Sequence, residues 1–162
     1  VDLFTFGYFM GGINFGDMAS LKSENIVDGR LVYIRRKTHK LIRLPLQPKA
    51  LEIIERYHTN GALFLFPILS DFHKTEQQQR NRLHKVLSNV NKRLKRIGKE
   101  LEIPIDLTTY VSRHSYATVL KRSGVSTSII SESLGHSSEK VTQYYLDSFE
   151  NSQIDEAMKN LL

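Results

Sequence analysis

One amphipathic pattern, between residues 76 and 101, constrains the fold of this chain more than any other feature. Apolar residues recur there at the i, i+3, i+4, i+7 spacing that places them on one face of an α-helix, namely Leu83, Val86, Leu87, Val90, Leu94 and Ile97. The other faces carry mostly basic residues, namely Arg82, Lys85, Lys92, Arg93, Lys95 and Arg96. The pattern predicts one long helix with an apolar face that packs on the domain. Its basic side chains indicate either a surface for a polyanion or an ordinary solvated helix face.

Two segments before this helix predict a β-hairpin over residues 30–46. RLVYIRR and LIRLPL are rich in residues typical of strands, and KTHK connects them. Pro45 marks the end or the edge of the second strand. A further short strand is expected near 63–66, in ALFLFP. The expected fold class is α+β, mainly α with a small antiparallel β-sheet.

Start and stop signals predict the other helices. Gly11 and Gly12 interrupt the first helical pattern, and Pro48 suits the first turn of a later helix. Ser126 and Ser138 are candidate N-caps, and Gly135 is a candidate terminator. The expected helices span 3–10, 17–22, 48–58, 127–134, 139 to about 146, and 153–162.

The charge of the chain favours a nucleic-acid partner. The 162 residues include 23 Lys and Arg against 17 Asp and Glu, for a net charge of +6 and a pI near 9.5. Nine of the basic residues lie between Lys74 and Lys99, where Glu76 is the single acid. Such a concentration of positive charge favours binding to phosphates by releasing counterions.

Composition also excludes several classes of protein. The chain has no cysteine, so disulfides, thiolate metal sites and thiol nucleophiles are ruled out. No run of 18 apolar residues and no cleavable signal pattern occurs, so we expect a cytoplasmic protein without membrane contact. The chain opens without Met and within an apolar run, so we expect residues 1–162 to be a single domain cut from a longer protein.

The chemistry of the chain is concentrated in SRHSYAT and LGHSSEKVTQYY. Tyr145 lies nine residues after His136 and 32 residues after Arg113. A tyrosine oxygen can attack phosphorus, while an arginine fork and a histidine stabilise the pentavalent transition state. These residues can therefore cut a phosphodiester without a metal or other cofactor. Paired carboxylates or a His-x-x-x-His cluster, as a metallonuclease would need, do not occur.

The order and spacing of these residues resemble the tyrosine recombinases, also called the phage integrase family. The resemblance runs from about Gly12 to about Phe149 and is most specific from Thr108 to Tyr145. It implies the catalytic-domain fold of that family and strand breakage and rejoining through a 3′-phosphotyrosyl bond on Tyr145. It also implies double-stranded DNA as substrate, a homotetramer on DNA, and accessory DNA-bending proteins. An N-terminal domain that completes the clamp around DNA would be missing from this chain.

The family pattern also assigns the supporting residues. Thr142 and Gln143 place the nucleophile at Tyr145, so Tyr144 is expected to pack elsewhere. Lys37, at the tip of the expected hairpin, matches the lysine that protonates the departing 5′ oxygen, with Lys40 as its rival. His114 is expected to orient its neighbours through hydrogen bonds.

Two positions depart from the family pattern. Asn14 stands where the first catalytic arginine belongs, and Tyr110 stands where a histidine is common. The Tyr110 hydroxyl can still hydrogen-bond a phosphate oxygen, whereas Asn14 supplies no charge. The absent arginine resembles some integrases of conjugative transposons. If another basic residue supplies the missing charge, Arg35, Arg36 and Arg43 on the hairpin are the candidates. Asp17 is expected to cap or pair within the fold.

An alternative function remains open from the sequence. The chain could be a catalytically decayed DNA-binding module, a reading that Asn14 supports. The segment GVSTSIISESLG, 124–135, also resembles part of a helix-turn-helix, as in a DNA-binding regulator. A regulator would not need Tyr145, Arg113, His136 and Lys37 together, so we expect the enzyme.

Overall fold

The computed structural model describes residues 1–57 and 59–158, and the side chains of residues 1–57 and 59–148. In this part the fold is mainly helical with one small antiparallel sheet, which confirms the predicted fold class. No helix in the described residues is long and apolar enough to cross a membrane. Along the chain the elements are α1 (Asp2–Phe9), α2 (Phe15–Ala19), the 3-10 helix η1 (Ser23–Asn25), β1 (Ile26–Val27), β2 (Arg30–Ile34), β3 (Leu41–Pro45), α3 (Pro48–Tyr57), α4 (Glu76–Glu100), α5 (Thr109–Arg122), α6 (Thr127–Leu134) and α7 (Glu139–Met158).

The predicted hairpin forms between β2 and β3. Antiparallel pairing runs from Arg30 opposite Pro45 to Ile34 opposite Leu41. Alternation along the strands buries Leu31 and Ile42 in the core. The short strand β1, which the sequence reading missed, pairs with the other edge of β2.

The strand expected near 63–66 is wrong. That segment is a series of bends, and the backbone N–H of Leu65 donates to the carbonyl of Leu21 over 2.8 Å. Leu65 and Phe66 are apolar because they fill the core beside the sheet. The Phe66 ring meets that of Phe6 edge-to-face, with centroids 4.8 Å apart.

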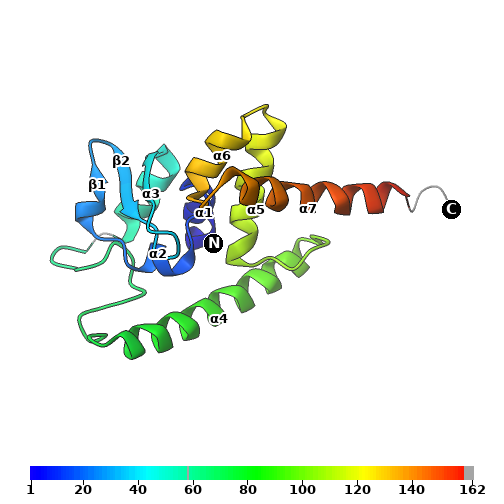
Figure 1. Ribbon diagram of the computed structural model, residues 1–162. Helices are drawn as coiled ribbons and strands as arrows, with labels where there is room; N and C mark the ends of the chain where they lie inside the picture. Colours follow the sequence, from blue (N-terminus) through cyan, green and yellow to red (C-terminus); the bar gives the residue numbers. More distant parts are fainter. Residues whose placement is uncertain (58, 159–162) are drawn as a thin grey trace.

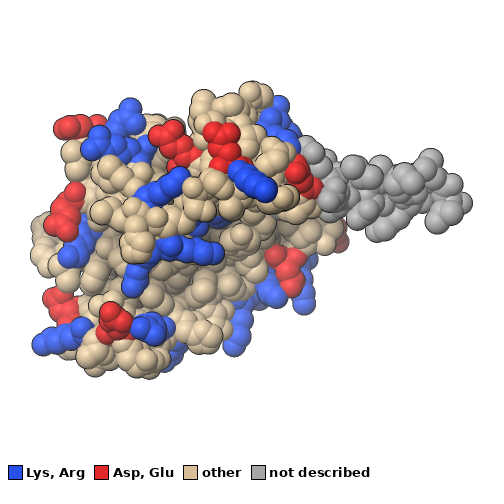
Figure 2. Space-filling model, viewed as in Figure 1, with Lys and Arg blue, Asp and Glu red and all other residues tan. Residues whose placement is uncertain are grey.

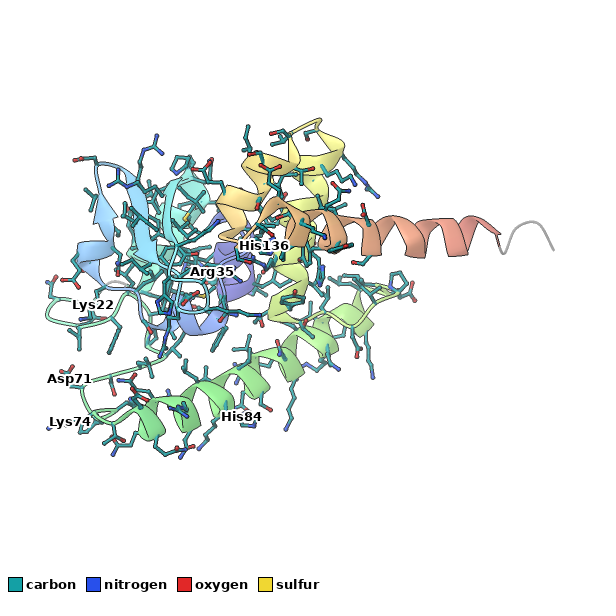
Figure 3. The ribbon with its side chains drawn as sticks, viewed as in Figure 1. Lys22, Arg35, Asp71, Lys74, His84 and His136 are labelled. Carbon is teal, nitrogen blue, oxygen red and sulfur yellow. The ribbon has the colours of Figure 1, made fainter. Side chains whose placement is uncertain are left out.

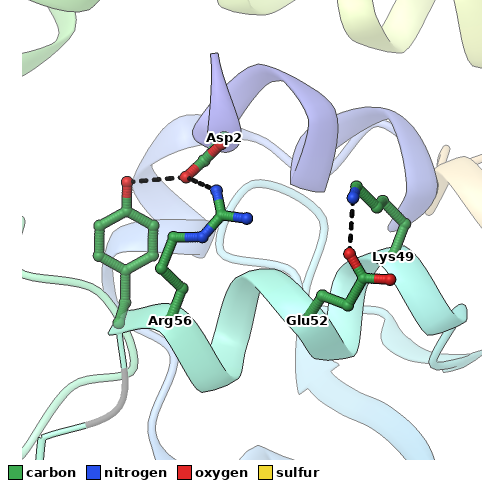
Figure 4. Close-up of polar contacts among 5 residues, drawn as sticks. Asp2, Lys49, Glu52 and Arg56 are labelled. Atoms are coloured by element: carbon green, nitrogen blue, oxygen red, sulfur yellow. Dashed lines mark hydrogen bonds and ion pairs between the residues drawn. The ribbon is translucent and has the colours of Figure 1, made fainter.

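The main core joins α1, α2, the sheet, α3 and the 63–69 segment. At its rim, Asp2 of α1 accepts hydrogen bonds from Arg56 at 2.7 Å and from Tyr57 at 3.1 Å (Figure 4). Within α3, Lys49 donates to Glu52 over 2.6 Å. Exposed ion pairs contribute at most about 1 kcal/mol each. Apolar burial therefore stabilises this core more than its polar rim does.

A second, smaller core holds α5, α6 and α7 together. It consists of Ala117, Ile130, Leu134 and Leu146, with Tyr145 packed against it. The prediction of α6 over 127–134 is confirmed, because Ser126 caps the helix and Gly135 ends it in the left-handed conformation, at φ 62°.

The long helix α4 confirms the 76–101 prediction to within one residue. Thr75 and Gln78 form a reciprocal capping box at its start. Within the apolar stripe Leu94 is buried, whereas Leu83, Val86 and Leu87 are half-buried. In Figure 1 the helix runs along the lower edge of the molecule, away from the sheet. Leu83, Val86 and Leu87 on its inner face pack against the main core, and Leu83 and Leu87 also line a cavity.

Two predicted helices have wrong boundaries. The helix expected over 17–22 spans Phe15–Ala19, and it begins earlier because the Asn14 side chain caps it. The helix expected to end near 146 continues as α7 to Met158, because 147–152 contains no glycine or proline to stop it. Residues 159–162 of the separate last helix that was expected lie outside the described residues.

Candidate active site

A cavity of about 670 Å³ lies where α2, the hairpin tip, α4, α5 and the start of α7 meet. All the residues that the sequence singled out for chemistry line it, namely Tyr145, Arg113, His136, Lys37 and Tyr110. Lys and Arg side chains gather across the middle of the face shown in Figure 2. The cavity thus offers an electropositive environment for an anion.

Arg113 forms the floor of this cavity and is 6% exposed. Its Nη1 donates to the carbonyl of Gly12 at 2.9 Å, and its Nη2 donates to the carbonyl of Leu134 at 2.7 Å. A Cβ on Gly12 would lie 2.6 Å from the Arg113 Cα, so only glycine fits there. Burial, reinforced by the nearby Arg35, lowers the pKa of Arg113. Two backbone carbonyls fix the guanidinium before any substrate arrives.

His136 follows the turn that ends α6. Its backbone N–H donates to the carbonyl of Ser131, and its Nδ1 lies 2.8 Å from the Thr142 hydroxyl of α7. Burial is the main cause that lowers the pKa of His136 to about 4, and the neighbouring cations, Arg113 first, add to it. The imidazole is therefore neutral at pH 7.

Tyr145 projects from α7 between the two histidines. Its ring stacks on His114 with centroids 5.1 Å apart and stands edge-on to His136 at 5.5 Å. Tyr110 also contacts His114. The two rings meet edge-on, with their centroids 4.4 Å apart. Burial, followed by the Tyr110 phenol, raises the pKa of Tyr145 above its usual range. The phenol therefore keeps its proton until a substrate changes this environment.

The neighbouring Tyr144 faces away from the cavity. It is 65% exposed, and the Lys140 ammonium lies 5.8 Å from its ring centroid. The expectation that Tyr144 points elsewhere on the helix is confirmed, but the expectation that it packs is wrong.

The hairpin tip is tied to the His136 turn. Thr38 Oγ1 donates to the carbonyl of Gly135 at 2.8 Å, and Arg35 Nη1 donates to the same oxygen at 2.5 Å. Figure 3 shows Arg35 and His136 close together at the centre of the molecule. These two bonds hold Lys37, which lines the cavity, whereas the rival Lys40 does not line it.

Asp17 also holds the hairpin tip, through a hydrogen bond to its backbone. It is buried, and its Oδ1 accepts the backbone N–H of Arg36 at 3.1 Å. Burial raises the pKa of Asp17, while the bond from Arg36 and the nearby arginines oppose that shift. The expectation that Asp17 pairs within the fold is confirmed.

Asn14 has a structural role that explains its side chain. It is the N-cap of α2, and its Oδ1 accepts the backbone N–H of Gly16 at 2.9 Å. Of the three candidate arginines on the hairpin, Arg35 lines the cavity together with Asn14. Arg36 and Arg43 are exposed and line other grooves.

Other residues at the cavity were missed by sequence reasoning. His84 and Asn91 of α4 line it, and Asn91 Oδ1 accepts the backbone N–H of Thr109 at 2.9 Å. Their spacing of two helical turns, on the side of Leu87, was the available signal. Among the described residues no three His, Asp or Glu side chains group as metal ligands.

Comparison with known proteins gives a consistent result. The family model described as "Phage integrase family" matches residues 8–152. A tyrosine recombinase of Thermosipho africanus is 26% identical over 155 residues, which cover 93% of this chain and 50% of the relative. An integrase of Escherichia phage P2 is 28% identical over 136 residues, which cover 83% of this chain and 34% of the relative. The chain therefore spans half or less of the length of these relatives.

Solved structures share the fold. The XerA recombinase superposes with a TM-score of 0.61 at 19% identity, over 89% of this chain and 56% of the other. The Tn1549 transposon integrase, solved in complex with a circular intermediate DNA, has a TM-score of 0.62 at 16% identity, over 89% and 52%. The catalytic domain of bacteriophage HP1 integrase has a TM-score of 0.55 at 18% identity, over 98% and 79%. These similarities confirm that the fold is that of tyrosine recombinase catalytic domains.

Proposed function

The chain belongs to the phage integrase family, and on this basis we propose that it is the catalytic domain of a site-specific DNA recombinase that integrates or excises a mobile element. The observation that carries the proposal is the cavity itself. Residues from the hairpin, α5, the α6–α7 turn and α7 converge there in the combination that phosphodiester transfer needs.

The proposed reaction conserves the energy of the phosphodiester. The Tyr145 oxygen attacks phosphorus, a 3′-phosphotyrosyl bond forms, and the bond to the 5′ oxygen breaks. Attack on that phosphotyrosine by the 5′ hydroxyl of a partner strand reverses the step and joins new DNA. The phenol loses one proton and the 5′ oxygen gains one, so the first step is neutral overall.

Each residue at the cavity has a proposed role in that step. Arg113 is preorganised by the Gly12 and Leu134 carbonyls and directs its remaining N–H groups at the non-bridging oxygens. His136, being neutral, donates a hydrogen bond to the phosphate. Lys37 on the hairpin tip protonates the departing 5′ oxygen, and the exposed Tyr110 hydroxyl adds a further hydrogen bond.

Arg35 is the proposed substitute for the absent arginine. It is the candidate that lines the cavity, and its charge acts on both Arg113 and His136. One Nη1 bond to Gly135 leaves other N–H groups of the guanidinium for a phosphate. A second guanidinium can therefore reach the transition state from the hairpin instead of from α2.

The partners of the whole protein follow from the same proposal. Its substrate is double-stranded DNA, a proposal supported by the basic cavity and by similar folds solved with DNA. Exchange between two duplexes needs two cleavages on each, which a homotetramer on DNA supplies. Accessory DNA-bending proteins and a cytoplasmic location belong to the same proposal.

The test is formation of a covalent protein–DNA adduct on a nicked suicide duplex that carries the protein's recombination site. Tyr145→Phe, which removes one oxygen and little packing, should abolish the adduct and leave DNA binding within about twofold. Tyr144→Phe is the matched control and should form adduct normally. Chelation of divalent metals should not change the rate, because Arg113, Arg35 and Lys37 supply the positive charge.

Other outcomes would redirect the proposal. If Tyr144→Phe abolished the adduct and Tyr145→Phe did not, the nucleophile would be Tyr144. If the wild-type protein bound the duplex and formed no adduct, the DNA-binding module without cleavage, which Asn14 favours, would be the better function.

A further inference from the structure

Thr142 has a contact that the family resemblance did not assign. It lies on α7, is fully buried at 0% exposure, and places its hydroxyl 2.8 Å from His136 Nδ1. In the part of the chain that the structure describes, this is the one hydrogen bond recorded for the hydroxyl. A threonine in a helix commonly donates to the carbonyl four residues earlier, and no such bond is recorded for Thr142. Its hydroxyl is therefore committed to the imidazole.

The direction of this hydrogen bond depends on whether His136 Nδ1 carries the ring proton. A hydroxyl has one proton to donate, and a buried donor without an acceptor is costly. If Nδ1 carried the ring proton, it would donate to Thr142, and the hydroxyl proton would have no recorded acceptor. If Nδ1 is bare, the hydroxyl donates to it and both groups are satisfied. The second arrangement is the stable one.

We propose that Thr142 is a positioning residue that sets the tautomer of His136, by donating to Nδ1 and thereby placing the ring proton on Nε2. The inference rests on the proposed function, because the Nε2–H is then the donor presented to the phosphate in the cavity that His136 lines. Without Thr142 the ring could turn a bare nitrogen toward the phosphate, which would repel its oxygens.

The helix that carries Thr142 also carries the proposed nucleophile, Tyr145. Thr142 and Tyr145 are three residues apart on α7, so they lie on one face of that helix. The same rigid element therefore presents the nucleophile and orients the neighbouring imidazole. Neutral imidazole is a precondition for a choice of tautomer, and burial beside Arg113, Arg35 and Lys37 provides it.

The direct test is an NMR measurement of the imidazole nitrogens in the ¹⁵N-labelled chain at pH 7. One- and multiple-bond ¹⁵N–¹H spectra distinguish a protonated from a bare ring nitrogen, and the His136→Gln variant identifies the His136 signals. The expected wild-type result is a protonated Nε2 and a bare Nδ1. A protonated Nδ1 in the wild type would overturn the proposal without any variant at Thr142.

Variants then assign the effect to the hydroxyl. Thr142→Val keeps the shape of the side chain and should lower the ratio of the Nε2–H to the Nδ1–H tautomer roughly fivefold, the effect of one lost hydrogen bond. Thr142→Ser keeps the hydroxyl and should restore the ratio. Ser133→Ala removes a neighbouring hydroxyl that donates to the Ile130 carbonyl, and it should leave the ratio unchanged. An unchanged ratio in Thr142→Val would refute the role of Thr142.

Adduct formation separates this inference from the proposed function. At saturating DNA, Thr142→Val should slow adduct formation about tenfold while the dissociation constant for DNA stays within twofold. If Thr142→Val shifts the tautomer but His136→Gln forms adduct at the wild-type rate, the tautomer assignment stands and the catalytic role of His136 fails.

Discussion

Asn14 caps α2 by accepting the Gly16 N–H, whereas the charge that an arginine at this position would supply comes, in our proposal, from Arg35 of the hairpin. An asparagine is among the best N-caps, whereas an arginine side chain cannot accept that bond. The departure from the family pattern thus has a local structural benefit.

These roles predict that substitution of Asn14 lowers stability, whereas substitution of Arg35 lowers the rate of cleavage. Asn14→Ala should lower the free energy of unfolding by about 1 kcal/mol, through the lost cap, and should slow adduct formation only slightly. Arg35→Lys keeps a charge but loses the planar fork, and it should slow adduct formation about 100-fold. Urea unfolding and single-turnover cleavage measure the two effects. Equal, small losses of cleavage in both variants would contradict the role of Arg35.

His136 predicts a pH dependence of stability. Its pKa is about 4 in the folded chain and near 6.5 when unfolded, so the unfolded chain binds more protons between these values. The stabilisation is complete above about pH 6.5 and is lost as the pH falls toward 4. The loss amounts to roughly 3 kcal/mol at about 1.4 kcal/mol per pKa unit.

Urea unfolding between pH 7 and pH 4 checks this prediction. The free energy of unfolding of the wild type should fall more steeply than that of His136→Gln, in which the titrating group is absent. Parallel curves for the two proteins would show that His136 does not carry the pH dependence.

At the scale of elements, the hairpin tip depends on one backbone oxygen. The Gly135 carbonyl accepts from both Thr38 and Arg35, so two hydrogen bonds connect the hairpin tip to the α6–α7 turn. Gly135 adopts φ 62°, and a Cβ there would lie 2.7 Å from Ile42. The close approach of hairpin and turn therefore requires glycine as well as the two donors.

This arrangement predicts that Thr38→Val impairs protonation of the leaving group. The variant loses one hydrogen bond to Gly135, loosens Lys37, and should slow adduct formation roughly tenfold, with a cost in stability of about 1 kcal/mol. Thr38→Ser, which retains the hydroxyl, is the matched control. A duplex with sulfur in place of the 5′ bridging oxygen needs no acid, so it should restore the rate of Thr38→Val. A slow reaction on that substrate as well would point to a general loss of the site.

At the scale of the whole molecule, the excess of positive charge predicts that the affinity for DNA depends on salt. The net charge is +6, and Arg80, Lys85, Lys92, Arg93 and Arg96 are exposed on α4. Contacts of Lys and Arg to phosphates release counterions, so affinity falls steeply with salt. The chain should bind a duplex weakly and lose about tenfold or more in affinity between 50 and 200 mM salt, for as few as two phosphate contacts.

Fluorescence anisotropy with a labelled duplex measures this dependence. Lys85→Gln and Lys92→Gln test whether the outer face of α4 contributes, because each lost phosphate contact reduces the slope by about one. Binding that is insensitive to salt would contradict a phosphate-dominated interface.

The sequence by itself determined the elements whose signals are local. The apolar spacing of α4, the Ser126 cap and Gly135 stop of α6, and the strand residues of the hairpin depend on neighbours within a few turns, and each appeared as predicted. The Tyr145, Arg113 and His136 motif was recognised from the order and spacing of its residues, which resemble those of the phage integrase family. Where apolar residues fill a core without periodicity, as at 63–66, local signals misled.

Only the tertiary structure decided which side chains meet at the cavity. Arg35, Arg36 and Arg43 lie on one hairpin and look alike in sequence, yet strand register and the contact with Gly135 place only Arg35 beside Arg113. In the same way, the sequence used Thr142 only to assign Tyr145 as the nucleophile. Its hydrogen bond with His136 depends on the packing of α6 on α7. Such contacts join residues that the chain brings together only after its cores have formed, so no local pattern specifies them.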